Sequence, residues 1–108
     1  MAAGYRAAFN LNRRESPRDD VYYRTRATDD AGLSFGLQIV NISATGFMAR
    51  TEAALAPGSW MTLRLPVVGQ IRADVRWALG GRVGCQFEQM IDLAPYLDLL
   101  GALVRDAR

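Results

Sequence analysis

The chain has no histidine, and Cys85 is its only cysteine among 108 residues. Structural zinc sites are built mainly from Cys and His, so none is predicted. A Ser–His or Cys–His nucleophile pair is also excluded. A lone cysteine cannot form an internal disulfide, which suits a reducing compartment. Because no set of nucleophile, base and metal is discernible, we expect a protein that is not an enzyme and needs no cofactor.

Long apolar runs are missing as well. A membrane-spanning helix needs about 18 or more consecutive apolar residues, and the sequence contains no such run. The N-terminal residues lack the apolar stretch and cleavage site of a signal peptide. We therefore expect a cytoplasmic protein with no membrane insertion.

Lysine is absent, and all 13 basic residues are arginine. The identity of any one arginine is therefore weakly informative, although arginine suits phosphates and planar rings. The net charge of +2 is too small to indicate bulk nucleic-acid binding, so neither DNA nor RNA is expected as a partner. The distribution is uneven, because residues 1–26 hold six arginines against three acidic residues.

Half of the chain is apolar, which is typical of a folded domain. Six short segments have the composition and alternation of strands. They span residues 21–27, 34–42, 47–51, 60–66, 70–78 and 82–88. Gly80-Gly81 between the last two is typical of a hairpin turn.

Alternation within the later strands predicts the residues that face the core. They are Met61, Leu63, Leu65, Ile71, Ala73, Val75, Trp77, Val83, Cys85 and Phe87. From Asp92 the period becomes helical. Leu93, Leu97, Leu100 and Val104 share one stripe, flanked by Tyr96 and Leu103.

These patterns predict a single, mainly β domain over residues 1–108. We expect an irregular, flexible N-terminal arm (1–20), a six-stranded antiparallel barrel (21–88) and a C-terminal helix (92–106) packed on it.

The turn NISATG (41–46) joins two predicted strands. Gly46 allows a positive φ and a close approach to the backbone. Ser43 can bond the local backbone or a ligand, and Asn41 offers an acceptor and a donor. An ordinary β-turn uses the same residues.

The arm carries RRESPR (13–18), in which Arg14 and Arg18 form R-x-x-x-R. The same pattern recurs at Arg72 and Arg76, so alone it is close to chance. By contrast, [DN]-x-S-x-x-G is expected by chance only on the order of a few per cent of the time.

In combination, RESPR (14–18) and NISATG (41–46) resemble the two signatures of the PilZ domain family, bacterial receptors for cyclic di-GMP. A V-x-W strand end (75–77) and GGRVGCQF (80–87) are also similar to family members. The resemblance implies a PilZ-type six-stranded barrel with a helix, and a role in motility, polysaccharide or biofilm control through an unknown downstream protein.

The resemblance assigns ligand contacts to Arg14, Arg18, Asn41, Ser43 and Gly46. Cyclic di-GMP has two phosphates and two guanines, and arginine reads the O6 and N7 edge of guanine. The arm is expected to reorganise on binding. An arginine at the position of Arg13 resembles members that bind two intercalated cyclic di-GMP molecules, so two per chain are predicted.

Two other functions stay open at this point. One is a PilZ-like protein-interaction adaptor without nucleotide binding, and the other is a small RNA-binding barrel. The sequence leaves the choice between monomer and homodimer open.

Overall fold

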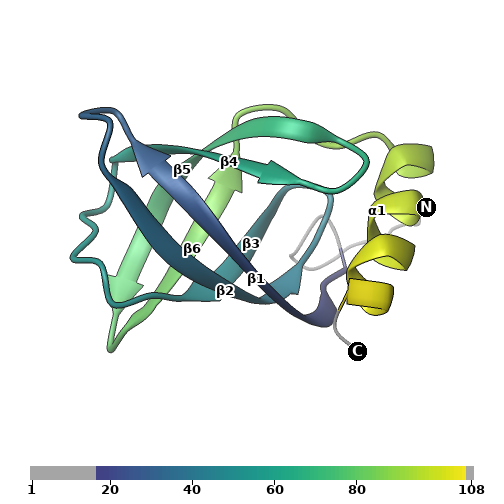
Figure 1. Ribbon diagram of the computed structural model, residues 1–108, viewed down its shortest axis with the longest axis horizontal. Coiled ribbons are helices and arrows are strands. Elements are labelled where there is room, and N and C mark those ends of the chain that lie inside the picture. Colours follow the sequence, from purple (N-terminus) through teal and green to yellow (C-terminus); the bar gives the residue numbers. More distant parts are fainter. Residues whose placement is uncertain (1–16, 107–108) are drawn as a thin grey trace, which may run out of the picture.

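The computed structural model describes residues 17–106, which form six strands and one helix (Figure 1). Their bounds are β1 Asp19–Asp29, β2 Ser34–Ile42, β3 Gly46–Arg50, β4 Trp60–Leu65, β5 Gly69–Leu79, β6 Arg82–Phe87 and α1 Leu93–Asp106. Each predicted strand is present, and β2 has the predicted bounds. The first strand is longer than predicted by two residues at each end, so its first two residues belong to the expected arm.

The strands close into an antiparallel barrel in the order β1-β2-β3-β6-β5-β4, with β4 paired to β1. The predicted mainly β barrel with a C-terminal helix is therefore confirmed. Gly80 and Gly81 both have positive φ, as the tight hairpin between β5 and β6 requires.

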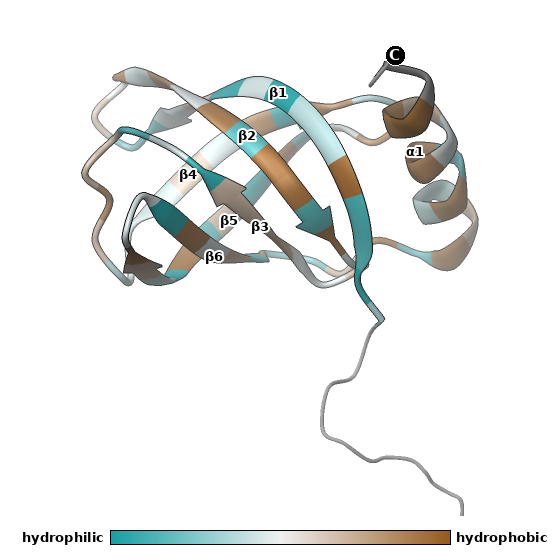
Figure 2. Cartoon of the chain, turned by 90° about the horizontal axis from the view of Figure 1, so that it is seen from below, coloured by the Kyte–Doolittle hydropathy of each residue, from teal (hydrophilic) through white to brown (hydrophobic). Residues whose placement is uncertain are grey.

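The helix α1 lies across one end of the barrel, as Figure 1 shows. Its side chains Tyr96, Leu99 and Leu103 join the apolar core formed by the inward residues of the strands. Alternate brown and teal residues along β2 in Figure 2 reflect this division between an apolar inner face and a polar outer face.

The face of α1 that packs on the barrel differs from the predicted stripe. Leu93, Leu97 and Val104 are exposed, whereas the predicted flanking residues Tyr96 and Leu103 are buried. The helix is apolar on more than one side, so periodicity alone could not select the packing face.

The prediction for Trp77 was wrong, because its side chain is 40% exposed on the outside of the barrel. Val75 pairs with Cys85 but Trp77 pairs with Gly84, so Arg76 is an extra residue in β5. Such a bulge reverses the alternation of inward and outward side chains beyond it. The other nine predicted core residues on β4, β5 and β6 are buried or packed against the core.

Within residues 17–106, no helix is long and apolar enough to cross a membrane. The same residues contain no cluster of three or more Cys, Asp or Glu side chains able to hold a metal ion.

Candidate ligand-binding site

The turn between β2 and β3 is held by its own hydrogen bonds. The amide of Ser43 donates to the carbonyl oxygen of Gly46 at 2.8 Å, and the amide of Thr45 donates to Ser43 Oγ at 3.2 Å. Ser43 is the one buried polar residue among those described, with 5% of its surface exposed. Its hydroxyl therefore has a fixed position, set by the backbone of the turn.

Gly46 is required at this turn for a reason that differs in part from the predicted one. Its φ is not positive, so conformational freedom does not explain the glycine. A Cβ at this position would overlap the carbonyl oxygen of Cys85 on the neighbouring strand β6. The predicted close approach to the backbone is present, and it is an approach of β6 to β3.

Arg18 lies directly before β1 and next to the end of β2. Asp19 pairs with Ile42 and Asp20 with Asn41, so the start of β1 runs beside the NISATG turn. The Arg18 guanidinium donates to Asn41 Oδ1 at 3.5 Å. This is a long hydrogen bond for two polar groups, so the bond restrains Arg18 only weakly.

A pocket of about 420 Å³ collects residues from both sequence motifs. Its lining consists of Arg18, Ser43, Thr45, Gly46, Phe47, Arg76, Trp77, Gly84, Cys85 and Gln86. The structure thus brings together three of the predicted residues, Arg18, Ser43 and Gly46. Asn41 adjoins the pocket through its bond to Arg18, and Arg13 and Arg14 lie outside the described residues.

Seven lining residues were not predicted as site residues: Thr45, Phe47, Arg76, Trp77, Gly84, Cys85 and Gln86. Trp77 lies so close to Gly84 that a Cβ there would overlap the indole ring. The ring therefore covers the backbone of β6 while remaining 40% exposed at the pocket. The bulge at Arg76 places the side chains of Arg76 and Trp77 at the pocket. The alternation of residues in the sequence does not reveal this bulge.

Charge at this pocket is mainly positive. Arg76 pairs with Asp74 at 3.2 Å, and this guanidinium stays largely exposed. Arg18 forms no ion pair within residues 17–106. Two guanidinium groups, a hydroxyl and a flat indole are suited to bind a ligand that combines phosphate with planar rings.

The start of β1 is also tied to the helix. The hydroxyl of Tyr96 on α1 donates toward Asp19 Oδ2 at 2.7 Å and lies 3.0 Å from the carbonyl oxygen of Ile42. Burial raises the pKa of Tyr96 above its ordinary value, and the bond and charge of Asp19 raise it further. The residue that follows Arg18 is therefore anchored to α1.

Cys85 is a buried side chain beneath the pocket, as predicted for a small apolar residue. Burial, with a smaller contribution from the charge of Asp74, raises the pKa of its thiol from 9.0 to about 12. The thiol is therefore neutral in the folded protein under ordinary conditions.

This thiol gives a pH dependence of stability with a definite sign. Because the folded pKa is raised above the unfolded value, the contribution of this thiol to stability is fully present at pH values well below 9 and is lost as the pH rises toward 12. Between about pH 8.5 and 10, wild type should lose about 1 kcal/mol more unfolding free energy than Cys85→Ala. Urea unfolding of both proteins across this range measures the difference, and parallel pH profiles would contradict it.

Comparison with known proteins identifies the fold. The family model described as PilZ domain matches residues 12–106. The structure of a K. pneumonia MrkH–c-di-GMP complex is similar with a TM-score of 0.63 and 19% identity, covering 90% of this chain and 54% of that one. A second MrkH crystal structure has a TM-score of 0.51 and 19% identity, covering 90% of this chain and 51% of that one.

The chain thus spans about half the length of these solved chains. At 19% identity, the likeness to the solved structures shows the fold alone. No curated protein matches the sequence. The family model, however, extends over most of the chain and includes both sequence motifs. The chain therefore belongs to the PilZ domain family.

Proposed function

We propose that this chain is a receptor domain for cyclic di-GMP that binds the nucleotide at the pocket beside the NISATG turn. The observation that carries the proposal is the convergence of Arg18, Ser43 and Gly46 on one pocket with Trp77. The family match and the likeness to a protein solved with c-di-GMP support the same ligand class.

The chemistry of the pocket fits the parts of the nucleotide. Arg18 and Arg76 are positioned to bind phosphate oxygens or the O6 and N7 edge of guanine. The exposed indole of Trp77 offers a face for stacking. Asn41 supplies an acceptor for guanine N–H donors once Arg18 releases it for the ligand.

The proposed response to nucleotide binding is a reorganisation of the N-terminal arm. On the basis of the sequence signature, Arg14 completes the site, and Arg13 sets the number of ligands bound. Both are proposed to close over the nucleotide together with Arg18. Because Asp19 is bonded to Tyr96, ordering of the arm acts on a segment that contacts α1. A downstream protein then reads the new surface.

Calorimetric titration with cyclic di-GMP tests the proposal, with GTP and a short RNA oligomer as controls. We expect saturable heat with cyclic di-GMP and none with the controls at micromolar protein. Absence of heat with cyclic di-GMP, beside clear binding of RNA, would favour an RNA-binding barrel. Absence of heat with all three would favour an adaptor without nucleotide binding.

Gly84→Ala should weaken cyclic di-GMP binding about tenfold, because the new methyl group displaces the Trp77 indole from β6. Trp77→Ala should cause a similar loss, because it removes the stacking face. The informative variant combines both changes. In the Trp77→Ala background, Gly84→Ala should cost little further affinity, because the ring it displaces is gone. Independent, additive losses in calorimetry would show that Gly84 acts by another route.

Arg13→Leu should lower the stoichiometry from two cyclic di-GMP molecules per chain toward one. The reason is that an intercalated pair carries four phosphates, whose repulsion needs an additional cation at the site. Calorimetric stoichiometry with a measured active fraction gives the number directly. A value of two that is unchanged in Arg13→Leu would refute the role of this residue.

A further inference from the structure

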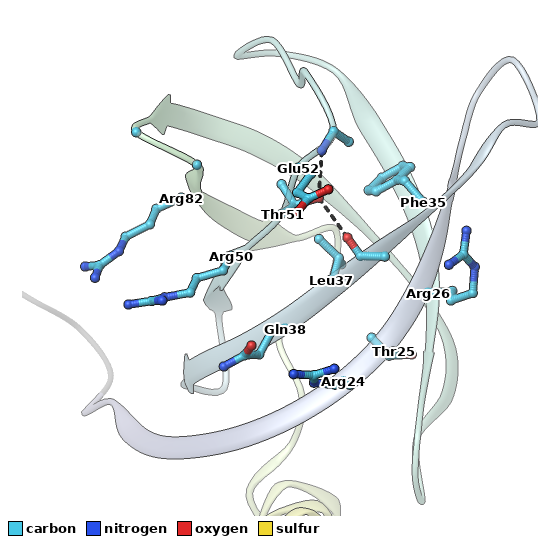
Figure 3. Close-up of a pocket in the computed structure, with 14 residues that line it drawn as sticks. Arg24, Thr25, Arg26, Phe35, Leu37, Gln38, Arg50, Thr51, Glu52 and Arg82 are labelled. Carbon is cyan, nitrogen blue, oxygen red and sulfur yellow. Dashed lines mark hydrogen bonds between the residues drawn. The ribbon is translucent and has the colours of Figure 1, made fainter.

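A second pocket, of about 1010 Å³, lies at the opposite ends of the strands that carry the proposed nucleotide site. It is lined by residues of β1, β2 and β3 and by the β5–β6 hairpin, as Figure 3 shows. None of its lining residues is shared with the pocket beside the NISATG turn. The two pockets are therefore separate surfaces of one barrel.

Strand register places a row of side chains across this surface. Arg24 pairs with Gln38, Gln38 with Arg50, and Arg50 with Arg82. Leu79 pairs with Arg82 and extends the row onto β5. Figure 3 shows Arg50 and Arg82 side by side, both directed away from the barrel. We call these five residues, Arg24, Gln38, Arg50, Arg82 and Leu79, the basic row.

The charges of the basic row are not neutralised within residues 17–106. The two ion pairs found there use Arg72 and Arg76, which lie outside the row. The Arg24 guanidinium donates to the hydroxyl of Tyr22 at 3.1 Å, and the side chains of Arg50 and Arg82 make no hydrogen bond to other described residues. Glu52 is the one acidic residue among those that line the pocket.

Opposing like charges on paired strands are unfavourable for folding. Arg50 and Arg82 face each other directly across β3 and β6, and such pairs destabilise a sheet. An acidic residue at either position would remove the repulsion. An arrangement that opposes stability and gathers arginines at a concave surface is typical of a binding site.

The apolar end of the row points to the class of partner. Leu79 is 80% exposed and sits beside Arg82. Single-stranded nucleic acid would need free aromatic faces, but Phe35 packs against the core and Arg24 lies over the ring of Tyr22. Each arginine of the row can bind a carboxylate through a pair of hydrogen bonds, and one exposed leucine lies next to them. This combination is complementary to an acidic protein segment that contains an apolar residue.

We propose that the basic row is a docking surface for an extended acidic segment of a partner protein, with its apolar residue against Leu79. Neighbouring strands lie about 4.8 Å apart, so the row is about 19 Å long and matches about six extended residues. This inference names the kind of downstream partner but does not depend on nucleotide binding.

The test is fluorescence anisotropy with a labelled peptide, Glu-Glu-Gly-Glu-Glu-Leu, at low salt, with and without cyclic di-GMP. We expect saturable binding that Arg50→Gln and Arg82→Gln each weaken about fivefold, and the double variant more than tenfold. Leu79→Ser should weaken the binding of this peptide but not the binding of a peptide in which Ser replaces Leu. Arg64→Gln, on the exposed side of β4, is the matched control and should have no effect.

Four results would overturn the proposal. They are no binding at millimolar peptide, equal loss in Arg64→Gln, equal binding of a peptide with Gln in place of Glu, and tighter, row-dependent binding of a thymidine oligomer. Because the peptide is titrated both with and without cyclic di-GMP, failure of the nucleotide proposal leaves this result interpretable. Peptide binding without any nucleotide binding would support the row alone.

Discussion

Gly46→Ala is expected to lower the free energy of unfolding by about 3 kcal/mol, which is a large effect for one methyl group. The added Cβ would overlap the carbonyl oxygen of Cys85 and lie 3.1 Å from Gln86 Cα. Both obstacles are backbone atoms of β6, which is paired with β3 at this level. Relief of the overlap therefore requires separation of two barrel strands rather than rotation of a side chain.

Gly36→Ala is the matched control for this prediction. Gly36 also lies in a strand and lacks a positive φ, but its nearest obstacle is the flexible end of Arg26 at 3.7 Å. We expect a change within about 0.5 kcal/mol. Urea unfolding of both variants measures the comparison. Similar stabilities would show that the contact between β3 and β6 adapts more easily than the geometry indicates.

Arg18→Ala should reduce the affinity for cyclic di-GMP about a hundredfold, because it removes charge-assisted hydrogen bonds to the ligand. It should leave stability almost unchanged, since Arg18 is exposed and makes only a long bond to Asn41. Calorimetry and urea unfolding on the same preparation separate the two effects. Arg14→Ala should produce a comparable loss of affinity, on the basis of the sequence signature.

Arg64→Ala controls for the loss of one positive charge. Arg64 is exposed on β4 and lines neither pocket. Its removal should change nucleotide affinity less than twofold, because exposed charges beyond a Debye length are largely screened. If Arg18→Ala binds as tightly as Arg64→Ala, the nucleotide lies elsewhere on the barrel.

Much of the barrel could be predicted because its strands obey simple alternation. Met61, Leu63 and Leu65 alternate inward, as do Val83, Cys85 and Phe87, and all six are buried. Regular period-2 patterns of this kind are the strongest sequence signal for a half-buried strand. The last hairpin could also be predicted, because Gly80 and Gly81 readily adopt the positive φ that its tight turn requires.

Predictions failed where tertiary packing overrides a local pattern. The bulge in β5 turns Trp77 outward, and nothing in the alternation of residues 70–78 marks the position at which it reverses. The helix has apolar residues on several faces, and contact with the barrel selects the face that contains Leu99 and Leu103. Both choices depend on neighbouring strands that a one-dimensional pattern does not describe.

Three of the ten residues that line the pocket beside the NISATG turn were predicted as site residues. The Asn-Ser-Gly turn and Arg18 were identified from two short motifs, and strand register brings them together. Several lining residues that were not predicted lie on β5 and β6, far along the chain from both motifs: Arg76, Trp77, Gly84 and Gln86. The contact between the indole of Trp77 and Gly84 joins two strands, so it depends on the strand register. A prediction of register could search for a glycine opposite a tryptophan.

The closed order of the six strands has a consequence for how other proteins associate with this one. Since β4 pairs with β1, every strand has a hydrogen-bonded neighbour on both sides. Among residues 17–106, the seam between β1 and β4 pairs only Ala27–Asp29 with Met61–Leu63, so strand addition is confined to the unpaired main chain beyond this seam. Elsewhere on the paired strands, recognition must use side chains, so substitutions that leave the backbone intact can change it.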